Sequence, residues 1–308
     1  MTPLFTLFAL LAFAANSILC RLALGSGSVD AATFTLIRLV SGAGALLALS
    51  AAVSGGRAEG DRCAPTTPAM PRPSSRDRWI SAALLFLYAG PFSFAYISLG
   101  VATGALILFP SAQFTLVVGA IVAGERLHWL EGVGMALGLG GFIYLVSPGL
   151  HAPSPVGSAL MAIAGVAWGF YSLRGRGSKD PIGATTANFV RSVPFALLVG
   201  AVALAARKAH VAPHGVSLAV ASGAIASGLG YVSWYAALRH LSAIRAAALQ
   251  FTVPIIAALG GFLLLSERLT TRLLLSAPPI LLGVGLAVGA RLKAAAPAPA
   301  APSAPRTS

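Results

Sequence analysis

Apolar runs of about 20 residues, separated by short segments with charge, Gly or Pro, dominate this chain and restrict its possible folds. A helix of that length crosses about 30 Å of hydrocarbon. Backbone amides inside a bilayer must be hydrogen-bonded within the protein, which leaves helical bundles and closed β-barrels. Barrel strands would alternate apolar and polar residues over about 10 positions, a pattern that these runs lack. The sequence therefore predicts an all-α integral membrane protein.

Charged residues are too few to cover a water-facing surface. They make up 9% of the chain, and residues of the AVILMFWYC set make up 57%, whereas a soluble domain carries about 25% charged residues. The formal net charge of +13 comes from Lys and Arg scattered between the apolar runs. That scatter argues against a nucleic-acid partner, and we expect the lipid bilayer to surround the chain. Cys20 and Cys63 lie in unlike surroundings, so we expect neither a disulfide framework nor a metal site, and no cofactor.

Ten segments are long and apolar enough to be interpreted as transmembrane helices. They are Pro3–Leu24, Ala31–Val53, Trp79–Val101, Ala105–Ala123, Trp129–Val146, Val156–Leu173, Ala184–Ala205, Val216–Leu238, Ala246–Leu265 and Leu273–Ala290. Most connections are short, but residues 54–78 form a polar loop rich in Arg, Pro and Ser. Residues 294–308 form an Ala- and Pro-rich tail with no apolar face to pack, and we expect this tail to be disordered.

The two halves of the chain resemble each other. Thr35–Arg38 is echoed by Asn188–Arg191, and each places an Arg several residues inside an apolar run. Glu125–Leu127 recurs as Glu267–Leu269, both reading Glu-Arg-Leu just after a long apolar segment. The two correspondences occur in the same order along the chain. A tandem duplication of a five-helix unit explains them.

The duplication predicts the architecture, because an odd number of helices inserts the second unit in the opposite orientation. We therefore expect two inverted five-helix repeats, over residues 3–146 and residues 156–290. Inverted repeats of this kind are associated with secondary transporters. If the N-terminus is cytoplasmic, most of the Lys and Arg in the predicted loops lie on the cytoplasmic side, as membrane proteins favour. Both termini are therefore predicted to be cytoplasmic.

These features resemble the EamA-type carriers of the drug/metabolite transporter superfamily, and the likeness covers nearly the whole chain. In the second half, Tyr235–Leu238, Pro254 and Ser266–Leu269 fit the family pattern closely. The first half departs from it. Phe13–Asn16 stands where family members often have Trp-Gly-x-Asn, and Pro110 is displaced by two residues from the position equivalent to Pro254. The resemblance implies a carrier that exchanges or exports small metabolites across a bacterial-type plasma (inner) membrane.

Polar side chains inside the apolar segments are candidates for a substrate cavity, because polar groups in the membrane interior usually face the centre of the bundle. Asn16, Gln113 and Gln250 are such groups. A carboxamide offers two donors and an acceptor to a small polar substrate. The alternative for each is a hydrogen bond between helices.

Four charged side chains are candidates for structural or gating roles. Arg38 and Arg191 lie about two turns inside their segments, where a charge is costly unless it is paired. They could attract an anionic or zwitterionic substrate, but their matching positions in the two halves favour a structural or gating role. Glu125 and Glu267 would suit proton coupling if buried. Because an Arg follows each of them at a segment end, an interfacial ion pair or cap is the preferred interpretation.

Aromatic side chains gather in the sixth and eighth segments. Trp168, Tyr231 and Trp234 are candidates for the cavity wall, and Tyr231 and Trp234 share a helix face. Trp168 lies near a predicted membrane interface, so anchoring there is its alternative. Gly90-Pro91 and Ser227–Gly230 are expected to be flexible points at matching positions in the two halves.

The preferred function is a secondary transporter, either permease or exporter, that moves small metabolites such as amino acids or related polar compounds by alternating access. An integral membrane enzyme and a non-transporting membrane scaffold are the alternatives. No His–carboxylate pairing lies inside an apolar segment, which argues against an enzyme. A small-molecule substrate is the expected partner. Glycines in the fifth and tenth segments suit a scaffold or a homodimer surface.

Overall fold

The computed structural model describes residues 2–55, 75–122, 124, 128–149, 152–175, 180–238, 249–250 and 252–294. Across these ranges the chain is helical apart from turns, with one isolated antiparallel bridge between Val29 and Val211. The described part of the chain is therefore all-α, as the sequence predicts. The predicted tail from residue 295 onward and residues 56–74 of the predicted polar loop lie outside the described ranges.

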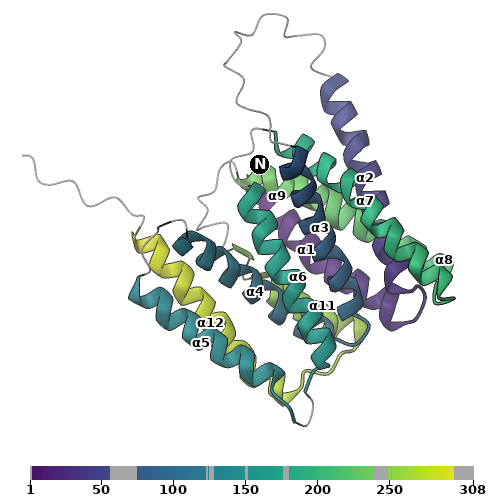
Figure 1. Ribbon diagram of the computed structural model, residues 1–308. Coiled ribbons are helices and arrows are strands. Elements are labelled where there is room, and N and C mark those ends of the chain that lie inside the picture. The colour runs from purple at the N-terminus through teal and green to yellow at the C-terminus, as the bar shows by residue number, and fades with distance from the viewer. Residues whose placement is uncertain are drawn as a thin grey trace, which may run out of the picture.

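The helices follow one another with short connections (Figure 1). They are α1 (Thr2–Gly25), α2 (Ala31–Gly55), α3 (Ser75–Ala95), α4 (Val101–Val122), α5 (Trp129–Val146), α6 (Pro155–Gly175), α7 (Pro181–Ala205), α8 (Pro213–Val220), η1 (Ala221–Leu229), α9 (Gly230–Leu238), α11 (Thr252–Leu265) and α12 (Thr271–Ala294). Helix α8, the π-helix η1 and α9 continue directly into one another, so the described residues contain ten helical stretches.

Seven of the described helical stretches are long and apolar enough to cross a membrane. They are α1, α2, α4, α5, α6, α7 and the continuous stretch of α8, η1 and α9. Helices α11 and α12 carry shorter apolar stretches. Large apolar side chains such as Val122 and Leu263 face outward, with 83% and 71% of their surface exposed. A continuous apolar exterior of this kind suits lipid rather than water, and the chain is a multi-pass membrane protein.

The predicted segment Trp129–Val146 coincides with α5, whereas the boundary between the third and fourth segments differs from the prediction. Helix α3 ends at Ala95 rather than Val101, and α4 begins at Val101 rather than Ala105. The cause is a distant residue, because the carboxylate of Glu267 accepts the backbone N–H of Val101 at 2.8 Å. A carboxylate at this position caps the start of a helix. No local sequence pattern near Val101 predicts this cap.

The start of α2 is fixed by Asp30. Its carboxylate accepts the backbone N–H of Thr33 at 2.9 Å and that of His210 at 2.9 Å, so it also ties α2 to the segment before α8. Partial burial opposes ionisation, but these hydrogen bonds outweigh it and hold the pKa of Asp30 below its usual value.

Helices α5 and α12 lie side by side along one edge of the molecule (Figure 1). Glycines permit their close approach, since a Cβ on Gly283 would collide with the backbone of Gly134 and Gly138. Of the glycines that the sequence assigns to a scaffold or dimer surface, Gly134, Gly138 and Gly283 therefore pack α5 against α12 within one chain, whereas a Cβ on Gly140, Gly285 or Gly289 would meet no atom within 4 Å. The remaining helices form a larger bundle beside this pair.

The contacts between helices repeat when the two halves are exchanged. Helix α1 packs against α9 and α11, and α6 packs against α3 and α4. Helix α2 packs against η1, and α7 packs against α3. Three further contacts, α2 with α7, α4 with α11 and α5 with α12, join helices at equivalent positions of the two halves.

The π-helix η1 lies against α2 at very close range. A Cβ on Gly223 would overlap the carbonyl oxygen of Arg38 and the hydroxyl of Ser41. Ser227 and Gly228, which the sequence marks as a flexible point, both belong to η1. Wide π-turns inside α-helices are frequent at functional sites.

Candidate functional site: a central aromatic cavity and its polar network

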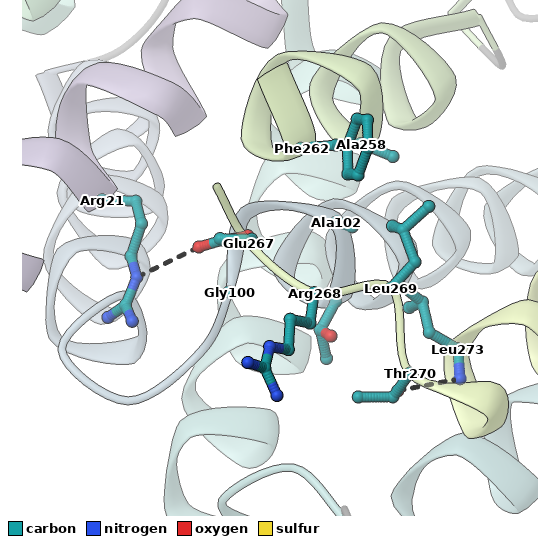
Figure 2. A pocket seen from close by; sticks show the side chains of 11 residues that line it. Arg21, Gly100, Ala102, Ala258, Phe262, Glu267, Arg268, Leu269, Thr270 and Leu273 are labelled. Carbon is teal, nitrogen blue, oxygen red and sulfur yellow. Dashed lines mark hydrogen bonds and ion pairs between the residues drawn. The ribbon is translucent and has the colours of Figure 1, made fainter. Parts of the chain in front are cut away.

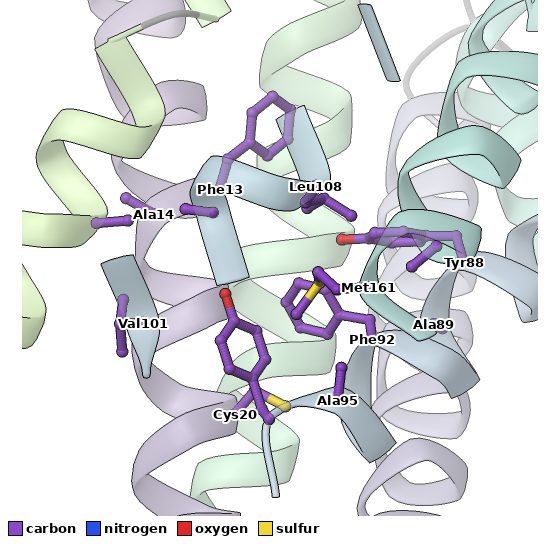
Figure 3. Packing of buried hydrophobic residues seen from close by; sticks show 14 of the residues in the cluster. Phe13, Ala14, Cys20, Tyr88, Ala89, Phe92, Ala95, Val101, Leu108 and Met161 are labelled. Atoms are coloured by element: carbon purple, nitrogen blue, oxygen red, sulfur yellow. The ribbon is translucent and has the colours of Figure 1, made fainter. Parts of the chain in front are cut away.

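Aromatic rings from five helices, with Phe109 of α4 among them, surround a small cavity in the centre of the bundle. Phe13 comes from α1, Tyr88 and Phe92 from α3, Trp168 from α6 and Tyr231 from α9. The centroid of the Trp168 ring lies 5.0 Å from that of Tyr88 and 5.2 Å from that of Tyr231. Such offset and tilted pairs are favourable ring geometries. Figure 3 shows Phe13, Tyr88 and Phe92 among the packed side chains of the buried hydrophobic cluster.

The cavity is small. Ser17, Leu108 and Phe109 complete its lining, and the volume open to the centre of a water-sized sphere is about 20 Å³. A single water needs roughly 10–15 Å³ measured in this way. The cavity therefore has room for about one water, and a metabolite enters only after the helices move apart.

Behind the rings, a chain of hydrogen bonds links α1, α2, α3 and η1. The amide nitrogen of Asn16 donates to the hydroxyl of Tyr88 at 3.3 Å, and the hydroxyl of Ser222 donates to the amide oxygen of Asn16 at 2.5 Å. Arg38 donates through Nη2 to the same Tyr88 hydroxyl at 3.2 Å and through Nε to Ser227 at 3.1 Å. The network joins polar groups from both halves of the chain, and one of its members, Tyr88, lines the cavity.

The two arginines that the sequence treats as equivalent have different surroundings. Arg38 is 1% exposed, and its guanidinium lies over the rings of Tyr88 and Phe92, 5.3 Å and 4.9 Å from their centroids. Arg191 is half-buried and donates to the carbonyl oxygen of Ala187, one turn earlier in its own helix. Only Arg38 reaches the central network.

The candidate cavity residues fall into four groups. Trp168 and Tyr231 line the cavity, so the described position of Trp168 is in the bundle centre. Trp234 is 6% exposed and packs on Phe13, with ring centroids 5.7 Å apart. Gln113 and Gln250 are buried and contact each other at 3.5 Å between amide nitrogen and amide oxygen, a link between α4 and the second half rather than part of the lining. Asn16 lies one hydrogen bond behind the lining.

At one end of the bundle, an ion pair joins the two halves. Arg21 near the end of α1 contacts Glu267 at 3.3 Å and also donates to the carbonyl oxygens of Tyr96 and Ile97 (Figure 2). Glu267 thus pairs with a distant Arg, not with its neighbour Arg268. The pair lies in the wall of a separate open pocket of about 240 Å³. The predicted counterpart Glu125 lies outside the described residues.

A second ion pair lies where α6 ends. Arg174 contacts Asp77 at 2.8 Å and also donates to the hydroxyl of Ser81, which ties the end of α6 to the start of α3. Arg21 and Arg174 each lie near the end of the first helix of a half. Within the described ranges, no three His, Cys, Asp or Glu side chains lie close enough to form a metal site.

Sequence reasoning missed Phe13, Tyr88 and Phe92 in the cavity wall and both serines in the network. Tyr88 and Phe92 are four residues apart, on one face of α3, and they flank the Gly90-Pro91 pair that the sequence does single out. That spacing was the available signal. Ser222 carries no such signal, and Ser227 is marked only as part of the flexible point Ser227–Gly230.

Comparison with known proteins places the chain among transporters. The profile of the EamA-like transporter family matches residues 155–289. A protein of Pseudomonas aeruginosa, described as uncharacterized, is 44% identical over 297 residues, covering 96% of this chain and 97% of the relative. A probable amino-acid metabolite efflux pump of Escherichia coli is 27% identical over 211 residues, covering 63% of this chain and 70% of the pump.

A solved crystal structure has a similar fold. The two chains superpose with a TM-score of 0.61 at 18% sequence identity, covering 93% of this chain and 96% of the other. At that identity the likeness concerns the fold alone.

Proposed function

Because this chain belongs to the EamA-like transporter family, we propose that it carries small metabolites, such as amino acids or related polar compounds, across the bacterial plasma membrane by alternating access. The family and the names of its relatives point to a membrane transporter rather than an enzyme. The amino-acid assignment draws on the Escherichia coli relative, whose name refers to amino-acid metabolites.

The observation that carries the proposal is the central cavity with its buried polar network. Aromatic walls from both halves surround it, and Asn16, Arg38 and Tyr88 bring hydrogen-bonding groups to its edge. Secondary transporters bind their substrates near the middle of the membrane, where the two repeats meet. Buried polar groups in a membrane bundle usually serve such a path.

We further propose that the chain has ten spans in two inverted five-helix repeats, with both termini cytoplasmic. The support for the repeat is that contacts between helices recur on exchange of the halves, together with the repeated Arg and Glu-Arg-Leu positions. The support for the orientation is the excess of Lys and Arg in the loops that would be cytoplasmic. In that topology the pair of Arg21 and Glu267 lies on the outer side.

The small size of the cavity supports alternating access. With room for about one water, the described conformation excludes a metabolite from both sides. The ion pair of Arg21 with Glu267 joins segments at one end of the bundle. The ion pair of Arg174 with Asp77 joins α6 to α3 at the other end. Transport then requires these ends to open in turn, while η1 and the Gly90-Pro91 site of α3 take up the movement.

The experiment is a ligand screen followed by flux. The unfolding temperature of the detergent-purified protein is measured against amino acids, nucleosides, sugar phosphates and cationic drugs. A ligand present at 100 times its Kd stabilises the native state by about 2.7 kcal/mol. We expect one chemical class to raise the unfolding temperature and to leave loaded liposomes only when the protein is present. A folded protein that neither binds nor moves any compound of the four classes contradicts the proposal.

The same preparation also tests assembly. Light scattering of the detergent complex reports whether the protein forms the homodimer that its glycine-rich segments suggest.

A further inference from the structure

The guanidinium of Arg38 is a buried charge with spare hydrogen-bonding capacity. Nε and Nη2 each donate to a hydroxyl, that of Ser227 and that of Tyr88. Nη1 is buried and has no hydrogen-bond partner among the described residues. A buried N–H group without an acceptor costs free energy, and for a charged group the cost is larger.

No carboxylate of the described residues neutralises this charge. The ion pairs found there join Arg21 with Glu267 and Arg174 with Asp77, both at the ends of the bundle. The immediate neighbours of Arg38 are neutral, namely two hydroxyls and the rings of Tyr88 and Phe92. Ring faces attract a cation but do not replace an anion. A charge kept in the membrane interior at this cost is usually functional.

The cavity lies directly beyond the groups that hold Arg38. The rings of Tyr88 and Phe92 contact the guanidinium, and the same two residues line the cavity. A small outward shift of these two rings would expose Nη1 to the cavity. The same shift would enlarge a space that at present holds about one water.

We propose that Arg38 binds the carboxylate of the transported molecule, an inference that rests on the proposed transport function. The planar guanidinium can present two parallel N–H groups to a carboxylate. The rest of the wall is mostly apolar, so the molecule it suits has an apolar body; it consists of Phe13, Ser17, Leu108, Phe109, Trp168 and Tyr231. Where that molecule is an amino acid, its ammonium group meets aromatic ring faces, which attract cations. The substrate class is therefore small carboxylates with an apolar body.

Arg191 provides the internal comparison. If an Arg at this position of a half served only to hold the bundle, the two would be expected to have similar surroundings. Instead Arg191 is half-buried and donates a hydrogen bond to Ala187 within its own helix. Arg191→Gln is therefore a matched control for Arg38→Gln, because each removes one guanidinium from the second helix of a half.

The test uses wild-type protein and matched ligand pairs. The probes are L-leucine, L-phenylalanine, 3-phenylpropionate and the carboxamide of each, measured by the shift in unfolding temperature and by counterflow in liposomes. We expect the carboxylates to bind, and each carboxamide to bind about 10- to 100-fold more weakly, as expected when a charge-assisted hydrogen bond is lost. Equal binding of carboxylates and carboxamides overturns the carboxylate site.

Variants locate the effect. Arg38→Gln is expected to remove the preference for carboxylate over carboxamide, and Arg191→Gln to retain it. Retention of the full preference in a folded Arg38→Gln protein overturns the role of Arg38. If that variant does not fold, Arg38→Lys keeps a positive charge but loses the planar pair of donors, and the same ratio is measured with it.

The two proposals fail differently. If nucleosides, sugar phosphates or cationic drugs bind and are transported while every carboxylate probe is inert, the carboxylate site is wrong and the transporter stands. If no compound binds or moves, the transport proposal itself fails.

Discussion

Single side chains at the centre of the bundle have more than one partner. The hydroxyl oxygen of Tyr88 accepts hydrogen bonds from Asn16 and Arg38, while its ring stacks against Trp168 and lines the cavity. Removing that oxygen would leave both donors with one acceptor fewer, inside a region from which water is largely excluded. The loss of an acceptor for a buried charged donor is among the more costly changes a side chain can undergo.

We predict that Tyr88→Phe lowers the free energy of unfolding by about 1–3 kcal/mol, because the ring remains and the acceptor for Asn16 and Arg38 is lost. The measurement is denaturant or thermal unfolding of the purified protein. The control is Tyr144→Phe, the same chemical change on α5 at a side chain that is 44% exposed. Equal stability of the two variants would show that the Tyr88 hydroxyl contributes nothing to the network.

Among the helices, the contact between α2 and η1 positions the site. The backbone of Gly223 lies close to α2 at Arg38 and Ser41. This contact fixes the position of the Arg38 backbone relative to η1. The wide π-turn also brings Ser222 and Ser227 onto the two network members from α1 and α2. A side chain at Gly223 would force α2 and η1 apart.

We predict that Gly223→Ala lowers the free energy of unfolding by about 1–3 kcal/mol, because its Cβ would meet backbone and side-chain atoms of α2. Gly44→Ala is the matched control within α2. A Cβ there meets no other atom within 4 Å, so the replacement is expected to be neutral or to stabilise by up to about 1 kcal/mol. A folded Gly223→Ala protein as stable as Gly44→Ala would contradict the close packing of α2 and η1.

The elements could be predicted from sequence where local signals decide. Trp129 begins α5 behind a capping box of His128 and Glu131, and the predicted segment coincides with the helix. The end of α3 and the start of α4 could not be predicted in this way. The cap of Val101 comes from Glu267, in the other half of the chain. Apolar periodicity carries no information about so distant a partner.

For the candidate site, the sequence indicated which residue types line the cavity, but it did not indicate which side chains contact each other. Trp168 and Tyr231 do line the cavity, because aromatic side chains in a membrane bundle are large enough to reach its centre. Gln113 and Gln250 contact each other through their side-chain amides instead. That pairing depends on how α4 packs against the second half of the chain. The duplication suggested one shared role for Arg38 and Arg191, but the packing around each half is not identical.

At the scale of the whole molecule, the described conformation leaves little free space at its centre. Arg21 and Glu267 join the halves at one end, Arg174 and Asp77 join α6 to α3 at another contact, and the cavity between them holds about one water. Arg174 and Asp77 are 34% and 49% exposed, and an exposed ion pair contributes little stability, about 0–1 kcal/mol. Little free energy is therefore needed to release that contact. The pair of Arg21 and Glu267 is part-buried, and Glu267 also caps α4.

The most direct test of the account measures flux through a protein in which positions 21 and 267 are reversibly cross-linked. Cysteines replace Arg21 and Glu267 in a background from which Cys20 and Cys63 have been removed, and a reducible bifunctional thiol reagent links the pair. The probe is a radiolabelled amino-acid mixture in loaded liposomes. The account predicts that flux stops when the link forms and returns on reduction. Undiminished flux through fully linked protein would contradict alternating access through this cavity.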